Sequence, residues 1–468
     1  MRGQKQAQIF TELEITDLAS EGMGVARHEG MVIFVEHTVT GDIVDVMITR
    51  KKSGFRQGRA IHFHKYSEIR RAAQCEHFGV CGGCKWQNLP YSVQLKHKEK
   101  QVYDALKRIA KVQLPDLNPI LGAPAEFYYR NKLEYTFSAT RWLTEAEVQS
   151  ELPFENRSGL GFHIPGRFDK VLNINTCHLQ AEPGNAIRNF VKSHALEHGL
   201  PFFDLREQTG LLRNLILRNS SAGEWMFLLA VTAECDEVFT LLDAVQTAFP
   251  QITSLNYAVN TKRNDTLYDL EVTNWKGIPY ITEHMEGLQF RIGPKSFYQT
   301  NSVQAYELYK VTREFADIQP TDTVYDLYTG TGTIALFVAK LAKKVAGIEY
   351  VSEAVADAEV NAGINGIINC TFTSGDMKDV LVPSFFELHG QPDIIITDPP
   401  RAGMHESVVN RLLESGARRI VYVSCNAATQ ARDLAILDQK YAVTRVQPVD
   451  MFPQTTHAEN VVALELRK

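Results

Sequence analysis

The chain has 468 residues, 44% of them hydrophobic, and a net charge of −6 at pH 7. This length exceeds one typical hydrophobic core and predicts two or three domains. No N-terminal stretch resembles a signal peptide, and no run of about 18 apolar residues could span a bilayer. We therefore expect a soluble cytoplasmic monomer without a membrane partner.

The charge is unevenly distributed along the chain. Residues 1–112 carry 18 Lys and Arg against 12 Asp and Glu, a net charge of +6, which leaves −12 for the remainder. The densest basic cluster spans residues 50–59 and includes Phe55. Such a surface can bind a polyanion such as RNA. Basic runs are more often plain solvated surface, so charge alone does not assign RNA binding.

Residues 1–66 consist of short runs in which apolar and polar residues alternate, separated by glycine-containing turns. This pattern is typical of a small all-β barrel. Residues 21–27 read E-G-M-G-V-A-R, which resembles the start of a TRAM domain, an OB-like RNA-binding barrel. The sequence therefore predicts a TRAM-like OB barrel over residues 1–66.

The seven cysteines are too few and too unevenly spaced for a disulfide scaffold in a chain of this size, yet three of them, Cys75, Cys81 and Cys84, fall within ten positions. Their spacing differs from the paired C-x2-C knuckles of a zinc ribbon, and soft thiolates suit an iron-sulfur cluster. The spacing also differs from the C-x3-C-x2-C of radical SAM (S-adenosylmethionine) enzymes, whose three thiolates leave one iron open. From these residues alone, zinc and an iron-sulfur cluster have nearly equal weight.

The segment after the cysteines predicts one helix and then a β-rich domain. Apolar residues recur at helical spacing over residues 91–112 with lysines between them, and we expect this helix to pack on the catalytic domain. Strand-like runs follow at residues 212–218, 225–232 and 267–272, among loops rich in Gly, Asn and Pro. These features predict a central domain over residues 67–295.

From about residue 296 onward, strands and helices alternate, which indicates a Rossmann-like α/β domain over 296–468. A predicted strand at 323–328 leads into the glycine loop 329–333, and the next strand ends in Glu349, 23 residues after Asp326. An acid at this spacing can bind a ribose. The loop is compatible with SAM and equally with NAD, so the following strand has to decide.

That strand ends in D-P-P-R at residues 398–401, which resembles motif IV of SAM-dependent methyltransferases. Enzymes that methylate amino groups usually carry an aromatic residue after the prolines, where it can stack on a planar base. Arg401 stands there instead. The motif therefore favours SAM over NAD and argues against N-methylation.

A cysteine and a carboxylate near the C-terminus suggest covalent catalysis. Carbon 5 of uracil is a poor nucleophile, and its methylation requires attack by a thiolate on carbon 6 and later removal of the C5 proton. Cys425 follows an apolar strand in S-C-N, although a lone cysteine there is more often a small core residue. Glu459 fits the base, whereas His457 is a structural residue, a substrate contact or a competing base.

Together, D-P-P-R, S-C-N, H-A-E at 457–459 and F-Y-Q-T-N at 297–301 resemble the RNA uracil-5-methyltransferases over nearly the whole chain. The resemblance implies SAM-dependent formation of 5-methyluridine in RNA. We expect 23S rRNA and a role in rRNA processing, because the tRNA-directed relatives lack the barrel and the cysteine cluster. Methylation of the tRNA T-loop is the alternative. An RNA-binding module on an inactive scaffold is the alternative outside enzymes, against which the intact Cys425 and Glu459 argue.

The same resemblance implies roles for individual residues. Cys425 is the expected nucleophile and Glu459 the expected base. The expected SAM contacts are Gln299, Tyr328, Glu349, Asp376 and Asp398. Cys177 matches the family's remaining cluster ligand, so a [4Fe–4S] cluster is expected on Cys75, Cys81, Cys84 and Cys177.

Overall fold

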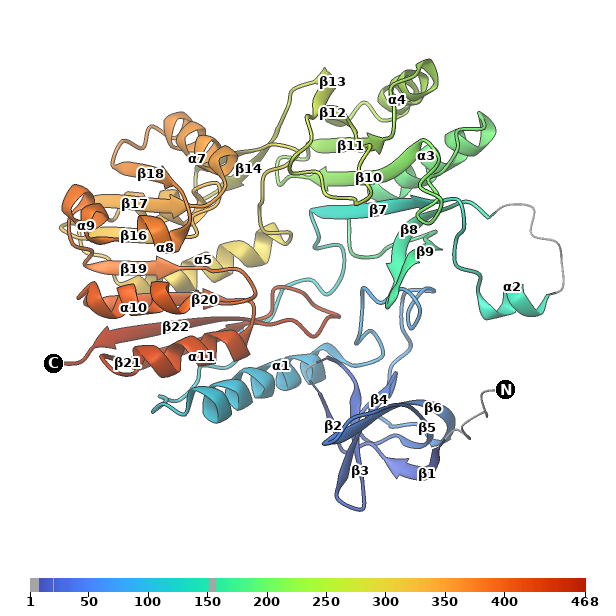
Figure 1. Cartoon of the computed structure of the whole chain (residues 1–468), viewed down its shortest axis with the longest axis horizontal. Helices are drawn as coiled ribbons and strands as arrows, with labels where there is room; N and C mark the ends of the chain where they lie inside the picture. The colour runs from blue at the N-terminus through green and yellow to red at the C-terminus, as the bar shows by residue number, and fades with distance from the viewer. Residues whose placement is uncertain (1–7, 20, 151–156) are drawn as a thin grey trace.

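The computed structural model describes residues 8–19, 21–150 and 157–468. These residues form a small barrel, a central β-sheet with helices, and a C-terminal α/β domain (Figure 1). Among them, no helix combines the length and the apolar character that crossing a membrane requires.

The barrel contains six strands in the order β1-β5-β6-β4-β3-β2. Alternate residues of these strands point inward, and Ile15, Ile33 and Val44 are fully buried, as period-two patterning predicts. The strands are β1 (Ile9–Glu14), β2 (Asp17–Leu18), β3 (Gly24–His28), β4 (Met31–Glu36), β5 (Ile43–Lys51) and β6 (Phe55–Lys65).

The helix that follows the cysteine-rich loop packs on the α/β domain. It comprises α1 (Tyr91–Ala105) and a π-helical turn η1 (Leu106–Ala110), and it ends at Lys111 in the left-handed conformation. Val102 and Leu106 are buried in the core of the α/β domain, beside α11 (Ala427–Leu437). Figure 1 shows α1 lying below α11 and leading back to the barrel.

The central domain is a seven-stranded sheet in the order β13-β12-β11-β10-β7-β8-β9. Helices α3 and α4 pack together and cover one face of it, whereas α2 lies beyond its edge (Figure 1). The strands are β7 (Lys132–Ser138), β8 (Gly159–Ile164), β9 (Arg167–Asn173), β10 (Leu212–Asn219), β11 (Trp225–Val231), β12 (Ile252–Val259) and β13 (Thr273–Gly277), and the helices are α2 (Glu145–Gln149), α3 (Gly184–Glu197) and α4 (Asp236–Ala248).

One strand prediction in this domain is wrong. Residues 267–272 form a turn and loop, in which the Leu270 N–H donates to the Leu267 carbonyl. Their apolar side chains cover the second face of the sheet by packing on Ile216, Leu228 and Ala258. The apolar pattern therefore correctly indicates burial, but the buried segment is a loop that covers the sheet and not a strand of it.

The hairpin of β14 (Ile281–Met285) and β15 (Leu288–Ile292) belongs by packing to the α/β domain. Its residues Ile281, Phe290 and Ile292 are fully buried in the same core cluster as α5 and α6. The α/β core therefore begins earlier than residue 296, the boundary that alternation of strands and helices predicts.

The α/β sheet has the order β18-β17-β16-β19-β20-β22-β21, parallel from β18 to β20 and antiparallel in β22. Helices cover both faces, so the carboxyl ends of the parallel strands meet at one edge, where such sheets bind ligands. The strands are β16 (Thr323–Leu327), β17 (Lys344–Glu349), β18 (Cys370–Ser374), β19 (Ile394–Thr397), β20 (Arg419–Ser424), β21 (Tyr441–Val449) and β22 (Glu459–Leu466). The remaining helices are α5 (Ser302–Ala316), α6 (Thr333–Ala339), α7 (Ser352–Ile364), α8 (Met377–Val380), α9 (Pro383–His389) and α10 (Glu406–Glu414).

Candidate active site

Five of the predicted site residues lie along one edge of the α/β sheet. Tyr328, Glu349, Asp376, Asp398 and Cys425 stand at or just after the carboxyl ends of β16, β17, β18, β19 and β20, which are neighbours in the sheet. The parallel strands therefore bring the expected SAM contacts and the expected nucleophile to a common edge.

Cys425 and Glu459 are brought together by strand register. Ser424 of β20 pairs with Asn460 of β22 in the antiparallel ladder. The next residue beyond this pair is Cys425 on one side and Glu459 on the other, and the two are close enough for the charge of Glu459 to act on the thiol. This pairing joins two motifs that are separated in the chain by α11 and β21.

The two carboxylates that act on Cys425, those of Glu459 and Asp398, are shielded from solvent, which favours their neutral form. Burial, followed by the charge of Asp398, raises the pKa of Glu459 to about 8. Burial and then Asp326 raise the pKa of Asp398 to about 7. Glu459 is only 5% exposed. A carboxylate with this pKa is a much stronger base than one in water, as proton removal from carbon requires.

The same surroundings raise the pKa of the Cys425 thiol to about 11, through burial and then through Glu459 and Asp398. Arg401 acts in the opposite direction and lowers it. The Arg401 carbonyl accepts hydrogen bonds from the Asn426 amide at 3.1 Å and from the Thr429 hydroxyl at 3.2 Å. The D-P-P-R and S-C-N segments are therefore joined, and the arginine is the cation that favours the thiolate.

The glycine loop after β16 is shaped by left-handed backbone at Tyr328, Gly330 and Gly332. Asp326 holds it from below, because its Oδ2 accepts from the Thr329 hydroxyl at 2.5 Å and from the Ala335 N–H at 3.0 Å. Its Oδ1 is buried without a hydrogen-bond partner among the described residues. A side chain at Gly330 would meet open space. The loop thus leaves room for a ligand beside a buried acceptor.

Glu349, Asp376 and Gln299 are also held by neighbours. Glu349 accepts from the backbone N–H groups of Gly330 and Val351, each at 3.0 Å. Asp376 caps α8 and pairs with Lys378 at 3.1 Å. The Gln299 carbonyl accepts from an amide of the central domain, that of Asn131, at 2.9 Å. A row of carboxylates complements the sulfonium and ammonium charges of SAM, so these residues fit that cofactor.

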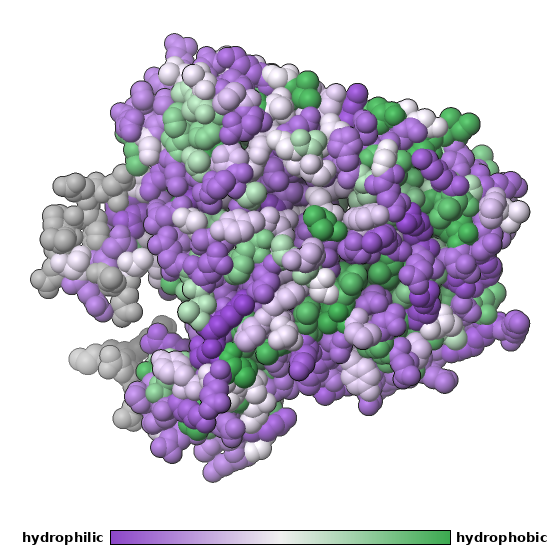
Figure 2. All heavy atoms as spheres, turned by 180° about the vertical axis from the view of Figure 1, so that it is seen from behind, coloured by the Kyte–Doolittle hydropathy of each residue, from purple (hydrophilic) through white to green (hydrophobic). Residues whose placement is uncertain are grey.

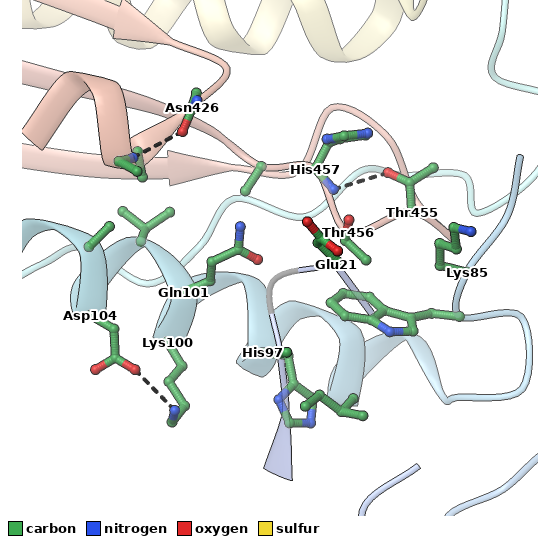
Figure 3. Close-up of a pocket in the computed structure, with 18 of the residues that line it drawn as sticks. Glu21, Lys85, His97, Lys100, Gln101, Asp104, Asn426, Thr455, Thr456 and His457 are labelled. Atoms are coloured by element: carbon green, nitrogen blue, oxygen red, sulfur yellow. Dashed lines mark hydrogen bonds and ion pairs between the residues drawn. The ribbon is translucent and has the colours of Figure 1, made fainter. Parts of the chain in front are cut away.

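A cleft of about 690 Å³ opens onto Cys425 from the side of the barrel. The barrel, α1, the cysteine-rich loop and the loop before β22 all contribute walls, as Figure 3 shows for Glu21, Gln101, Lys85 and His457. Burial lowers the pKa of His457, which keeps its imidazole neutral near pH 7. His457 therefore lines the cleft as a neutral polar group.

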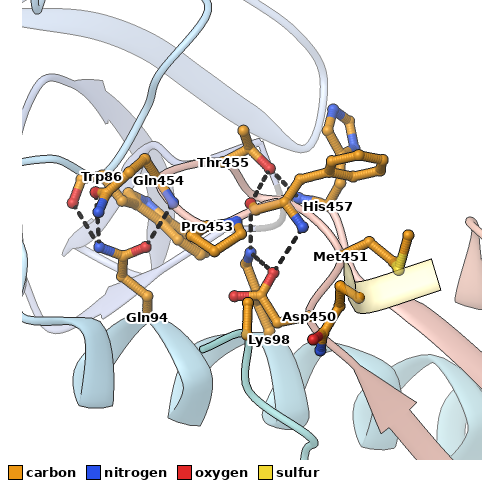
Figure 4. A network of polar contacts seen from close by, with 12 residues as sticks. Trp86, Gln94, Lys98, Asp450, Met451, Pro453, Gln454, Thr455 and His457 are labelled. Atoms are coloured by element: carbon orange, nitrogen blue, oxygen red, sulfur yellow. Dashed lines mark hydrogen bonds and ion pairs between the residues drawn. The ribbon is translucent and has the colours of Figure 1, made fainter. Parts of the chain in front are cut away.

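A buried polar network holds the loop between β21 and β22 in place (Figure 4). Lys98 of α1 and Asp450 form an ion pair of 2.6 Å, and both side chains are fully buried. The Lys98 ammonium also donates to the Phe452 carbonyl at 3.0 Å. The Tyr91 hydroxyl donates to Asp450 at 2.9 Å. Because this loop carries His457 and leads into Glu459, α1 fixes the position of the expected base.

The tip of this loop is joined to the cysteine-rich loop. Gln454 and Gln94 exchange two hydrogen bonds, of 3.0 and 2.9 Å. The Gln454 carbonyl accepts from the N–H groups of Lys85 and Trp86 at 2.7 and 3.1 Å. Barrel residue Gly22 also lies close, since a side chain there would approach Thr456 within 2.9 Å. Sequence motifs gave no sign of these contacts, which join positions more than 350 residues apart.

Comparison with known proteins decides the family. Residues 280–467 match the tRNA (Uracil-5-)-methyltransferase family, and residues 10–61 match the TRAM domain. The chain is 55% identical over 454 residues to an uncharacterized RNA methyltransferase of Bacteroides thetaiotaomicron, covering 96% of this chain and all of that protein. A counterpart from Porphyromonas gingivalis is 54% identical, with 97% and 99% covered. The chain belongs to the RNA uracil-5-methyltransferase family.

A solved structure supports this membership. The Pyrococcus abyssi tRNA (uracil-54, C5)-methyltransferase, in complex with S-adenosyl-L-homocysteine, is similar with a TM-score of 0.74 and 27% identity. The similarity covers 96% of this chain and 99% of that chain. The expected family, the α/β methyltransferase fold and the N-terminal TRAM domain are thereby confirmed.

The four cysteines expected to bind iron line one pocket of about 350 Å³ in this methyltransferase. Cys75, Cys81 and Cys84 come from the cysteine-rich loop, and Cys177 follows β9 in the central domain. All four are free of disulfides. Within the part of the chain that the structure describes, no three His, Cys, Asp or Glu side chains are placed to hold a single metal ion.

One further residue near the reacting groups has no motif around it. Tyr309 of α5 is 5% exposed, and its pKa is raised by burial and then by Asp398. Asp326 and Glu459 act on it as well. Tyr309 is thus a neutral phenol close enough for the charges of the three acids to act on it. The packing of α5 against β20 and β22 gives it this position.

Proposed function

We propose that this methyltransferase transfers a methyl group from SAM to carbon 5 of a uridine in RNA, with Cys425 as nucleophile and Glu459 as base. The observation that carries the proposal is the β20–β22 register, which brings the thiol close to a buried carboxylate with a raised pKa. Both groups lie at the sheet edge that carries the expected SAM contacts, and the cleft reaches Cys425.

In the proposed reaction the Cys425 thiol loses its proton to solvent in the cleft, and its sulfur bonds to C6 of the uracil. The electron pair displaced by this attack makes C5 nucleophilic. SAM, when bound, supplies the methyl group. Glu459 then takes the proton from C5, the electrons of that C–H bond restore the C5–C6 double bond, and the Cys425 thiolate leaves. Arg401 favours the thiolate both at the start and at the end.

The cofactor would be held by residues of the carboxyl edge and the segment before α5. Glu349 and Asp398 supply acceptors for its polar groups, and the loop from Tyr328 to Gly332 supplies backbone close to it. The full proposed set is Gln299, Tyr328, Glu349, Asp376 and Asp398. A target uridine must leave its stack to reach Cys425, so the substrate is expected to be a loop or an unpaired segment.

Two RNAs are candidates for the substrate. The family resemblance favours 23S rRNA, on the ground that tRNA-directed enzymes lack the barrel. The Pyrococcus abyssi tRNA enzyme aligns with 96% of this chain. The uncovered part is smaller than the barrel, so the alignment includes at least part of the barrel. A barrel is therefore no argument against tRNA, and this neighbour favours the tRNA T-loop as the second candidate. We infer a cytoplasmic monomer in either case.

We also propose that Cys75, Cys81, Cys84 and Cys177 hold a [4Fe–4S] cluster. Their convergence on one pocket supports it. The fourfold thiolate set leaves no open iron, so the cluster would join the cysteine-rich loop to the central domain and take no part in methyl transfer. Iron and sulfide analysis of anaerobically purified protein tests this, since zinc in place of iron would contradict it.

The function is tested by mapping 5-methyluridine in 23S rRNA and tRNA from cells with and without the gene. Loss from 23S rRNA alone selects the first candidate, and loss confined to the tRNA T-loop selects the second. RNA that contains 5-fluorouracil provides the chemical test, because fluorine at C5 blocks the elimination and traps the cysteine adduct. Unchanged 5-methyluridine in both RNAs together with no adduct would refute the proposed function.

A further inference from the structure

A second polar pocket, of about 280 Å³, lies in the central domain outside the active-site cleft. The cleft and the cysteine pocket share Gly83, and the cysteine pocket and this second pocket share His77. The three hollows therefore follow one another across the cysteine-rich loop. The second pocket is lined by His77, Arg141, Trp142, Thr144, Glu147, Ser158, Leu172, Asn173, Asn175 and Lys192.

Lys192 of α3 is the cation lining this pocket that has no counter-ion within the part of the chain that the structure describes. Its side chain is half-buried, and no ion pair or hydrogen bond of its ammonium occurs within the described residues. Burial lowers its pKa, and the nearest charges, Arg141 and Arg188, lower it further. Among the described residues, no carboxylate raises its pKa in return. A cation in such surroundings is stabilised when an anion enters the pocket.

Of the two neighbouring guanidinium groups, that of Arg141 is paired with a carboxylate, whereas that of Arg188 contacts neutral groups among the described residues. Arg141 forms a two-point contact with Glu147, at 2.6 and 3.1 Å, and the Thr144 hydroxyl donates to the same carboxylate at 3.0 Å. The guanidinium of Arg188 donates to Asn185 at 2.9 Å and to the Asn175 carbonyl. Arg188 does not line the pocket, so the cation that lines it without a counter-ion among the described residues is Lys192, with the Asn175 amide and the Trp142 ring also in the lining.

We propose that this pocket binds a backbone phosphate of the substrate RNA, on a stretch that continues from the target uridine past the cysteine-rich loop. This inference rests on the proposed RNA substrate. A phosphodiester carries the single negative charge that offsets Lys192, and its oxygens accept from the ammonium and the amide. Figure 2 shows the barrel as a separate lobe at the lower left, below the body of the molecule.

The test is the salt dependence of binding of fluorescein-labelled, unmodified tRNA and 23S rRNA transcripts to the purified full-length enzyme. Loss of one phosphate contact reduces the slope of log affinity against log salt by about 0.7–0.9. We expect this reduction in Lys192→Ala, with affinity lower by about 3- to 10-fold at low salt. Lys192→Glu should lose more, whereas Lys192→Arg should keep the slope of the unmodified chain.

Lys276→Ala is the matched control, because Lys276 lies on β13 at the far edge of the same sheet and pairs with Asp243 at 3.0 Å. It should leave the slope unchanged. Equal slopes for the parent chain, Lys192→Ala and Lys192→Glu would overturn the phosphate site. This outcome is separable from failure of the proposed function, because adduct formation with 5-fluorouracil RNA reports on Cys425 and does not require Lys192.

Discussion

The buried pair of Lys98 and Asp450 yields a quantitative prediction. Lys98→Met removes the cation and leaves Asp450 charged with no exposed surface. Breaking a buried pair in this way costs about 3–5 kcal/mol, against a total stability of about 5–15 kcal/mol for a typical domain. The loss of the 3.0 Å bond to the Phe452 carbonyl acts in the same direction. We therefore expect a large decrease in the free energy of unfolding.

The double variant Lys98→Met/Asp450→Asn separates the charge from the hydrogen bonds. The Asn oxygen can still accept from the Phe452 N–H, which bonds to Oδ1 of Asp450 at 3.0 Å. The amide nitrogen replaces Oδ2, so the 2.9 Å bond that this oxygen accepts from the Tyr91 hydroxyl is lost. Because the double variant buries no unpaired charge, it should be more stable than the sum of the single variants predicts, by about 2 kcal/mol. Urea denaturation followed by tryptophan fluorescence measures this, since Trp86 adjoins the network.

The control is Lys100→Met, two residues along α1. Lys100 is half exposed and pairs with Asp17 and Asp104 at 3.1 and 3.0 Å. An exposed pair contributes less than about 1 kcal/mol, so this variant should unfold at nearly the parent urea concentration. Additive losses in the Lys98 and Asp450 variants, or a Lys98→Met loss no larger than that of Lys100→Met, would refute the reasoning.

Four further outcomes follow from the active-site geometry. Cys425→Ala should abolish methylation and the 5-fluorouracil adduct while RNA binding persists, and an adduct in this variant on denaturing gels would contradict the assignment. Glu459→Gln should form the adduct but release it about 10²- to 10⁴-fold more slowly, as single-turnover kinetics measure; normal release would remove Glu459 as the base. Because the pKa of Glu459 is raised to about 8, its basic form grows as pH rises, so the release rate should increase up to about pH 8 and then level off. Arg401→Met should raise the pKa of the Cys425 thiol further, so that adduct formation slows at pH 7 and recovers in part at higher pH; an unchanged pH profile would show that Arg401 does not favour the thiolate.

The sequence by itself determined the local chemistry of the catalytic edge. A strand followed by a glycine loop, by D-P-P-R or by S-C-N is built from neighbours in the chain, so its turn, its burial and the end of the sheet at which it lies can be predicted. The period-two alternation of residues 1–66 predicts the barrel for the same reason.

Long-range packing decided what these local pieces do together. Only the insertion of β22 beside β20 brings Glu459 close to Cys425, because register depends on hydrogen bonds between strands that are remote in sequence. Only the fold buries Lys98 against Asp450. The tertiary structure also decides that residues 267–272 form a loop that covers the central sheet. An apolar run has the same pattern whether it forms a strand of a sheet or packs on the face of one. Side-chain pattern is a local property, whereas partners and register are settled by which surfaces the whole chain must bury.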